Sequence, residues 1–210
     1  LFRSRPNGNA GLLVTALRGF IEYQTQHAWI WEHQALTRAR FCAGDTRVGM
    51  AFEAERNRIL QLERPVTELL EEVLAMREKM HEGHPNTTAQ FDIKHDRGGM
   101  VDIEFIVQTL ILRFAHDYPE LTGNLGNIAL LRLAGALRLI DEALAERVGN
   151  AYREYRRRQH AERLCGAQSA RVSPAELTNE RAAVAALWET VFSGAPRVCR
   201  TLQEIHSAGR

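Results

Sequence analysis

The chain has 210 residues, of which 45% are hydrophobic and 25% charged, and its formal net charge is +1. This composition is ordinary for a globular protein that buries a core, and its charge balance gives no case for binding nucleic acid or a membrane surface. Cys42, Cys165 and Cys199 form no CxxC pair, so we expect reduced thiols in a cytoplasmic protein rather than a disulfide framework.

The first half of the chain is predicted to be helical. After a Gly- and Asn-rich turn at residues 6–11, apolar residues at spacings of three and four predict a helix over residues 13–40. A second periodic stripe predicts a helix over residues 48–80. Pro65 lies inside this stripe and removes a backbone hydrogen bond, so we expect a kink or a break near Arg64.

The second half follows the same pattern. Residues 81–90 are a predicted loop, 91–94 a short extended segment and 95–99 a turn. Helices are predicted over residues 100–116 and 127–139, from an Asp141 cap to about residue 165, and from Ser173 to about residue 192. No segment predicts a strand of ordinary length. The predicted fold class is all-α, an antiparallel helical bundle with short loops.

Gly98 and Gly99 stand immediately before the helix over residues 100–116. Such a start exposes the first amide groups to an anion, and Lys94 and Arg97 would add positive charge. Asp102, in the first helical turn, can instead occupy those amides. An ordinary glycine turn is favoured over a phosphate-binding loop, because an isolated Gly-Gly pair is a weak signal.

Asp102 and Glu104 resemble a carboxylate pair, but they are two residues apart, or about 200° around a helix axis. Their side chains therefore leave on nearly opposite faces and cannot share one metal ion. We expect at most one of them to face a cleft, and the other to pair with a basic residue of the bundle. None of the eight histidines has metal-site spacing.

A basic, aromatic cluster lies in the helix that follows Asp141. This composition suits a phosphate group or an acidic partner, although a solvated helix face is the commoner outcome. Its members are Tyr152, Arg153, Tyr155, Arg156, Arg157 and Arg158.

Three motifs carry a family resemblance. Residues 91–105, FDIKHDRGGMVDIEF, resemble the start of the helical domain that follows the C-terminal nucleotidyltransferase domain in the glutamine synthetase adenylyltransferase family. Residues 28–40 resemble the end of that nucleotidyltransferase domain, and residues 3–8 resemble the Arg-Leu-Arg-Pro element before it. The motifs occur in the family's order, so the chain is identified as a member, from the C-terminal, adenylylating half.

The resemblance implies an enzyme that transfers AMP from ATP to a tyrosine of glutamine synthetase, uses Mg²⁺ and regulates nitrogen assimilation. It implies glutamine synthetase and a PII-type signal protein as partners and glutamine as an effector. It also implies positions close to the nucleotide or the protein substrate, namely Arg5, Arg38, Lys94, Arg97 and Asp102.

The chain departs from the family pattern at the catalytic core. The family's metal-binding Asp-x-Asp motif does not occur, and Leu1 and Ser4 differ from the expected residues. We therefore assign no catalytic residue or metal ligand, and expect the carboxylates upstream and the chain to be inactive alone. On the resemblance, residues 1–45 end a nucleotidyltransferase domain, 46–195 form the bundle, and 196–210 are a poorly ordered tail.

Two alternative functions stay open. The bundle can be a docking module for the PII-type protein or for glutamine synthetase, without a role at the active site. It can also be the helical domain of a related uridylyltransferase, although residues 31–36, WEHQAL, favour the adenylyltransferase.

Overall fold

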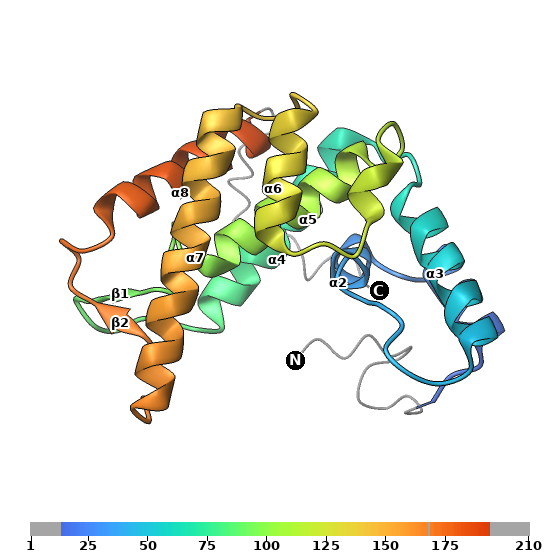
Figure 1. Cartoon of the computed structure of the whole chain (residues 1–210), viewed down its shortest axis with the longest axis horizontal. Helices are drawn as coiled ribbons and strands as arrows, with labels where there is room; N and C mark the ends of the chain where they lie inside the picture. Colours follow the sequence, from blue (N-terminus) through green and yellow to red (C-terminus); the bar gives the residue numbers. More distant parts are fainter. Residues whose placement is uncertain (1–13, 168, 194–210) are drawn as a thin grey trace, which may run out of the picture.

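A computed structural model describes residues 14–167 and 169–193. In this part of the chain the structure is mostly helical, which confirms the predicted all-α class (Figure 1). The longer helices are α1 (Leu17–Gln26), α2 (Ile30–Leu36), α3 (Thr46–Leu60), α4 (Val66–Glu82), α5 (Met100–Phe114), α6 (Asn127–Ala136), α7 (Glu142–Leu164) and α8 (Thr178–Phe192). The other elements are the 3₁₀ helix η2 (Pro119–Thr122) and the two-residue strands β1 (Phe91–Asp92) and β2 (Arg171–Val172).

Helix α5 forms the centre of the core. Most of its residues are buried, including polar Asp102 and Thr109, and it packs against α2, α4, α6, α7 and α8. A helix that is apolar on nearly all sides requires neighbours on all sides, which explains this position. Figure 1 shows α3 toward one end of the molecule and the β1–β2 pair at the other, with α5 running between them.

Two predicted helix boundaries are confirmed. Helix α3 ends at Leu60 and α4 begins at Val66, with Pro65 as its N-cap, so the chain breaks where proline removes the hydrogen bond. Asp141 caps α7, since its carboxylate accepts a hydrogen bond of 2.7 Å from the Leu144 amide.

Two other predictions are wrong in detail. The helix predicted over residues 13–40 is divided into α1 and α2, because the Glu32 carboxylate accepts the Trp29 amide at 3.0 Å and starts a new helix there. Ser173 does not begin α8: it forms a separate turn with Glu176, and the left-handed Leu177 (φ +57°) precedes the helix start at Thr178.

The extended segment predicted at residues 91–94 is present only as β1, which pairs antiparallel with β2 through Phe91 opposite Val172. Among the described residues, no helix is both long and apolar enough to cross a membrane. Arg5 and the predicted tail at 196–210 lie outside the described residues.

Candidate functional site

The glycine turn before α5 is closed by its own neighbours. Asp102 accepts a hydrogen bond of 2.6 Å from the Gly98 amide and forms a 2.6 Å ion pair with Nε of the buried Arg77. Arg77 also donates to the His95 carbonyl at 2.9 Å, and the Tyr155 hydroxyl donates to the Gly98 carbonyl at 2.9 Å. The Gly99 and Met100 amides donate to the carbonyls of Asp96 and Ile93. The amide groups that an anion would need are therefore engaged, and the segment is a glycine turn with an acidic cap.

Glu104 points away from this turn, as its position on the helix predicts. One of its carboxylate oxygens lies 3.3 Å from Nη1 of Arg38 and accepts a hydrogen bond of 3.1 Å from the Tyr152 hydroxyl. Asp102 and Glu104 thus pair with different basic residues on different faces of α5. Of the two, only Glu104 has partners that line a cavity.

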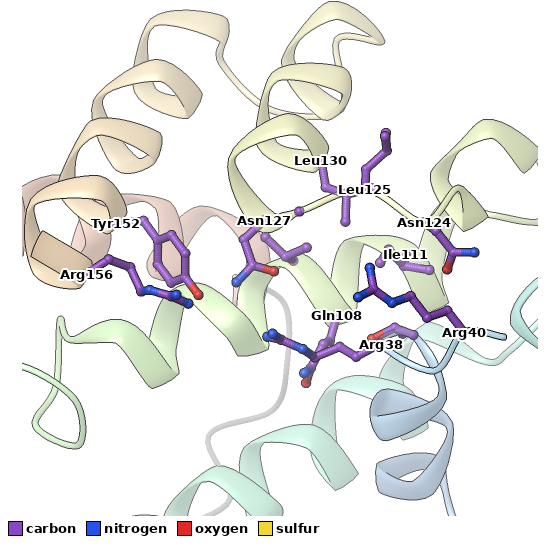
Figure 2. A pocket seen from close by; sticks show the side chains of 13 residues that line it. Arg38, Arg40, Gln108, Ile111, Asn124, Leu125, Asn127, Leu130, Tyr152 and Arg156 are labelled. Atoms are coloured by element: carbon purple, nitrogen blue, oxygen red, sulfur yellow. The ribbon is translucent and has the colours of Figure 1, made fainter. Parts of the chain in front are cut away.

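That cavity has a volume of about 380 Å³, and we call it the arginine pocket (Figure 2). It lies where the segment after α2 meets α5, the loop before α6, and α7. Its lining is Thr37, Arg38, Arg40, Val107, Gln108, Ile111, Asn124, Leu125, Gly126, Asn127, Leu130, Tyr152 and Arg156. Three of these residues are arginines and none is a carboxylate, so the pocket is suited to an anionic ligand.

Tyr152 is a hydrogen-bond donor on one wall of this pocket. Burial and the nearby Glu104 carboxylate raise the pKa of Tyr152, and a hydrogen bond with Arg156 opposes them without cancelling the effect. The phenol therefore keeps its proton at neutral pH. Figure 2 shows Tyr152 and Arg156 on one side of the cavity and Arg38 and Arg40 on the other, with Asn127 between them.

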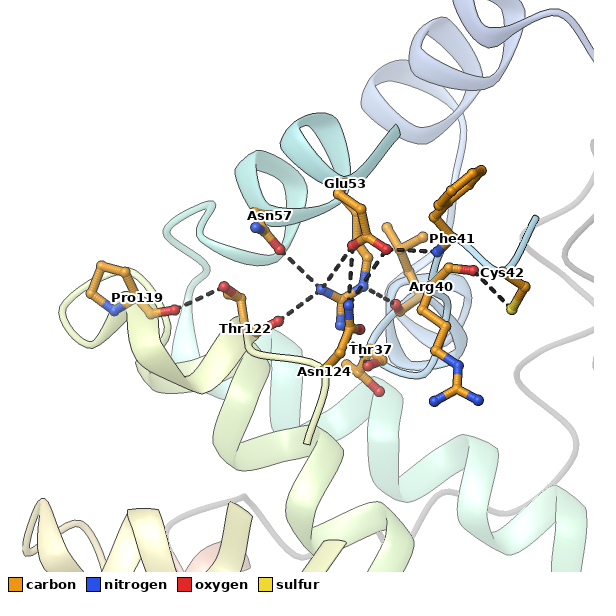
Figure 3. Close-up of polar contacts among 11 residues, drawn as sticks. Thr37, Arg40, Phe41, Cys42, Glu53, Asn57, Pro119, Thr122 and Asn124 are labelled. Atoms are coloured by element: carbon orange, nitrogen blue, oxygen red, sulfur yellow. Dashed lines mark hydrogen bonds and ion pairs between the residues drawn. The ribbon is translucent and has the colours of Figure 1, made fainter. Parts of the chain in front are cut away.

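A buried arginine joins the segments that form the pocket (Figure 3). Arg56, on α3, is 1% exposed and donates to the carbonyls of Leu36 at 3.1 Å, Thr37 at 2.7 Å and Thr122 at 2.8 Å. These carbonyls lie at the ends of α2 and η2, directly before the two loops that carry Arg38, Arg40 and Asn124. Arg56 therefore fixes the position of one loop relative to the other.

Glu53, one turn earlier on α3, supports the same joint. Its carboxylate accepts the Phe41 amide at 2.6 Å, lies 3.4 Å from Nδ2 of Asn124, and is 3.9 Å from Nη1 of Arg56. We call Arg56 and Glu53 the α3 clamp. Burial lowers the pKa of Arg56 more than Glu53 raises it, although an arginine so placed stays charged at neutral pH.

Of the five residues predicted from the resemblance, the four that the structure describes do not meet in one site, and Arg5 lies outside the described residues. Arg38 lines the arginine pocket, whereas Lys94 lines a separate cavity of about 170 Å³ with Asp92, His95 and Arg163 among its neighbours. Arg97 forms an exposed ion pair with Glu78 on α4, and Asp102 is buried against Arg77.

The sequence prediction missed most of the arginine pocket. Arg40 ends the motif at residues 28–40, but nothing in that motif distinguishes it from its neighbours. Gln108 and Asn127 show no pattern that indicates a site, and Arg56 is one of three arginines in an amphipathic helix. One signal was present: Tyr152 and Arg156 are four residues apart, on one helix face. The structure separates this pair from other members of the basic cluster, since Arg157 and Arg158 bind Glu154 and the Tyr155 hydroxyl donates to the Gly98 carbonyl.

The described residues do not fit a divalent metal ion. Within residues 14–167 and 169–193, no group of three or more His, Cys, Asp or Glu side chains is placed to hold one. The two carboxylates of α5 are bound to Arg77 and Arg38. No metal ligand is therefore assigned to this part of the chain.

Comparison with protein families matches two stretches of the chain. Residues 2–55 match the family model of glutamate-ammonia ligase adenylyltransferase, and residues 67–192 match that of GlnD PII-uridylyltransferase. The arginine pocket takes residues from both stretches, Arg38 and Arg40 from the first and Arg156 from the second.

Known relatives agree with the first of these families along almost the whole chain. The bifunctional glutamine synthetase adenylyltransferase/adenylyl-removing enzyme of Aromatoleum aromaticum is 55% identical over 92% of this chain. The enzymes of the same name from Burkholderia mallei and Ralstonia nicotianae are 56% and 57% identical over 90% of it.

The chain spans about a fifth of the length of these relatives. The match over residues 67–192 shows that the chain belongs to the family that the GlnD PII-uridylyltransferase model describes. Within it, the match over residues 2–55 and the similar enzymes place the chain among the glutamine synthetase adenylyltransferases, which confirms the family predicted from its motifs.

Proposed function

We propose that this chain is the helical part of an enzyme that transfers AMP from ATP to a tyrosine of glutamine synthetase and so regulates nitrogen assimilation. The observation that carries the proposal is 55% identity to the Aromatoleum aromaticum enzyme over 92% of the chain. The match of residues 2–55 to the adenylyltransferase family supports it against the uridylyltransferase alternative.

The proposal includes the enzyme's context. Mg²⁺ and ATP are its metal and nucleotide, a PII-type signal protein and glutamine control it, and it acts in the cytoplasm from the C-terminal, adenylylating half. Residues 1–45 end the nucleotidyltransferase domain and 46–195 form the helical bundle, followed by a tail at 196–210. Nucleotidyl transfer depends mainly on positioning and on neutralising phosphate charge, and a helical domain would contribute to both.

Arg38 is the proposed nucleotide-proximal residue with the most support, because it lines a pocket rich in arginine. Lys94, Arg97 and Arg5 stay predictions from motif position. Asp102 would act indirectly, by holding the turn that carries Lys94 and Arg97 through its bonds to Gly98 and Arg77. Charge-removing substitutions at Lys94 and Arg97 that leave AMP transfer unchanged would exclude a nucleotide role for them.

The alternative is a docking module that binds glutamine synthetase or the PII-type protein and takes no part in nucleotide binding. Calorimetric titration of the 210-residue chain separates the two. ATP binding that is lost in an Arg38→Gln variant supports the enzyme reading. Binding of either protein with no heat from ATP supports docking alone.

The direct test is a chimera in which this chain replaces the matching fifth of the Aromatoleum aromaticum enzyme. We expect the chimera to incorporate labelled AMP into glutamine synthetase within about tenfold of the parent rate, since most of the segment's positions are shared. The parent enzyme with this segment deleted is the control. A chimera that melts cooperatively and removes AMP from adenylylated glutamine synthetase, yet adds none, would contradict the proposal.

A further inference from the structure

The arginine pocket holds more positive charge than one small anion needs. Three guanidinium groups line about 380 Å³, and the lining contains no aspartate or glutamate. In Figure 2, Arg38 and Arg40 face the cavity from one side and Arg156 from the other. Guanidinium groups bind phosphate oxygens in pairs. Their placement on opposite walls therefore suits a chain of phosphate groups better than a single carboxylate or phosphate.

Neutral donors complete the lining. The Tyr152 hydroxyl and the side-chain amides of Gln108, Asn124 and Asn127 can each donate a hydrogen bond to a phosphate oxygen. Helix α6 begins beside them, and Gly126 provides no side-chain cap. The amide groups of its first turn therefore add to the positive potential that the arginines create.

Glu104 binds two of these groups, Arg38 and Tyr152. It lies 3.3 Å from Arg38 and accepts a hydrogen bond of 3.1 Å from Tyr152, and its side chain is 29% exposed. A carboxylate that binds a guanidinium and a phenol makes the contacts that a phosphate oxygen would make. An arriving phosphate chain must therefore compete with Glu104 for Arg38 and Tyr152.

We propose that the arginine pocket binds the di- or triphosphate chain of a nucleotide, or free pyrophosphate, and that Glu104 is its internal competitor. Arg40 and Arg156 provide the first attraction, and binding then transfers Arg38 and Tyr152 from Glu104 to the ligand. The identification of the phosphate chain as that of ATP or of released pyrophosphate rests on the proposed function. The phosphate-binding pocket and its competition with Glu104 rest only on the geometry of the pocket.

The test is calorimetric titration of the 210-residue chain with inorganic tripolyphosphate, pyrophosphate, ATP and AMP at low salt. We expect the three ligands with a phosphate chain to bind at least about tenfold more tightly than AMP, because AMP carries a single phosphate. Arg40→Gln and Arg156→Gln should each weaken tripolyphosphate binding by about tenfold or more. Arg157→Gln is the matched control, since Arg157 follows on the same helix but is bound to Glu154 outside the lining.

The Glu104→Gln variant tests the competition. Removing this negative charge should strengthen tripolyphosphate binding about three- to tenfold, because the charge lies beside the bound phosphate in a partly solvated site. Unchanged or weaker binding by a folded Glu104→Gln protein would overturn the competitor role. Equal losses in the Arg156→Gln and Arg157→Gln proteins would overturn the pocket, because they would mean non-specific attraction to α7.

The ligand series and the chimera give separate answers. If the chimera transfers AMP but the 210-residue chain binds no tripolyphosphate, the pocket proposal is overturned and the proposed function stands. If the 210-residue chain binds tripolyphosphate in the pocket but the chimera is inactive, the pocket proposal stands and the proposed function is overturned. Within the series, tighter binding of ATP than of tripolyphosphate identifies the nucleotide as the source, and tighter binding of pyrophosphate than of ATP identifies the product.

Discussion

Replacement of Arg56 by methionine tests the α3 clamp. Methionine fills much of the same volume but cannot donate, so the change removes four hydrogen bonds of 2.7–3.1 Å to three backbone carbonyls and the Asn57 side chain. The three carbonyls, of Leu36, Thr37 and Thr122, belong to residues that are at most 8% exposed. The Leu36 carbonyl would keep its hydrogen bond of 3.1 Å from the Ala39 amide, whereas those of Thr37 and Thr122 would lose the guanidinium while remaining largely out of water.

The expected loss of unfolding free energy follows from these contacts. A buried polar group left without a partner costs about 1–3 kcal/mol, and partial hydration of the Thr37 and Thr122 carbonyls brings the sum to about 2–4 kcal/mol. Glu53 adds little, because its side chain is 26% exposed and water can solvate it. Such a loss is a large part of the roughly 5–15 kcal/mol that stabilises a typical domain.

Urea unfolding followed by circular dichroism measures this loss. Arg58→Met, two residues later on α3, is the matched control, because Arg58 forms an exposed ion pair with Glu55 and should lose less than about 1 kcal/mol. An Arg56→Met protein that is destabilised no more than this control would refute the clamp.

Three further predictions concern stability and use the same urea titration. Arg77→Met leaves Asp102 buried without its counter-ion and should lower the free energy of unfolding by about 3–5 kcal/mol. A loss below about 1 kcal/mol would contradict a structural role for the Arg77–Asp102 pair. Gly99→Ala should lower the free energy of unfolding by about 2 kcal/mol, because the added Cβ would lie 2.6 Å from a backbone carbonyl oxygen. Gly126→Ala is the control, since its Cβ would meet nothing within 4 Å and the loss should be less than half as large. Equal losses in the two variants would refute this steric argument. Burial lowers the pKa of His33 more than its hydrogen bond to a backbone carbonyl raises it, so stability should be complete above about pH 6.5 and fall below it as the unfolded state takes up the proton. His33→Gln should flatten that fall, and an unchanged slope would show that other groups cause it.

The sequence predicted those features of the fold that depend on local signals. Pro65 and Asp141 mark helix boundaries because each acts on its own backbone neighbourhood. The break between α1 and α2 escaped prediction because residues 27–29 contain no glycine or proline. Its cause is the Glu32 side chain, which caps the Trp29 amide without the usual Ser or Thr before it.

The candidate site was harder to predict because it is built from distant segments. The arginine pocket joins Arg38 to Arg156 across more than half of the chain, and only packing brings them together. The Asp102–Glu104 geometry was predictable from helix periodicity alone, but the partners of each carboxylate were not. Motif resemblance identified the family and suggested Arg38 as a candidate, but it did not distinguish Arg40, Gln108 or the α3 clamp from their neighbours.

We propose that the arginine pocket of this chain serves a nucleotide-transferring enzyme. The measurement that tests it most directly is steady-state AMP transfer to glutamine synthetase by the chimera, with ATP varied, before and after Arg38→Gln. We predict that Arg38→Gln lowers kcat/KM for ATP by about tenfold or more, since a charged contact to phosphate is lost, while Arg58→Gln leaves it within about twofold. An active chimera in which Arg38→Gln and Arg58→Gln have the same effect would show that the arginine pocket takes no part in ATP use.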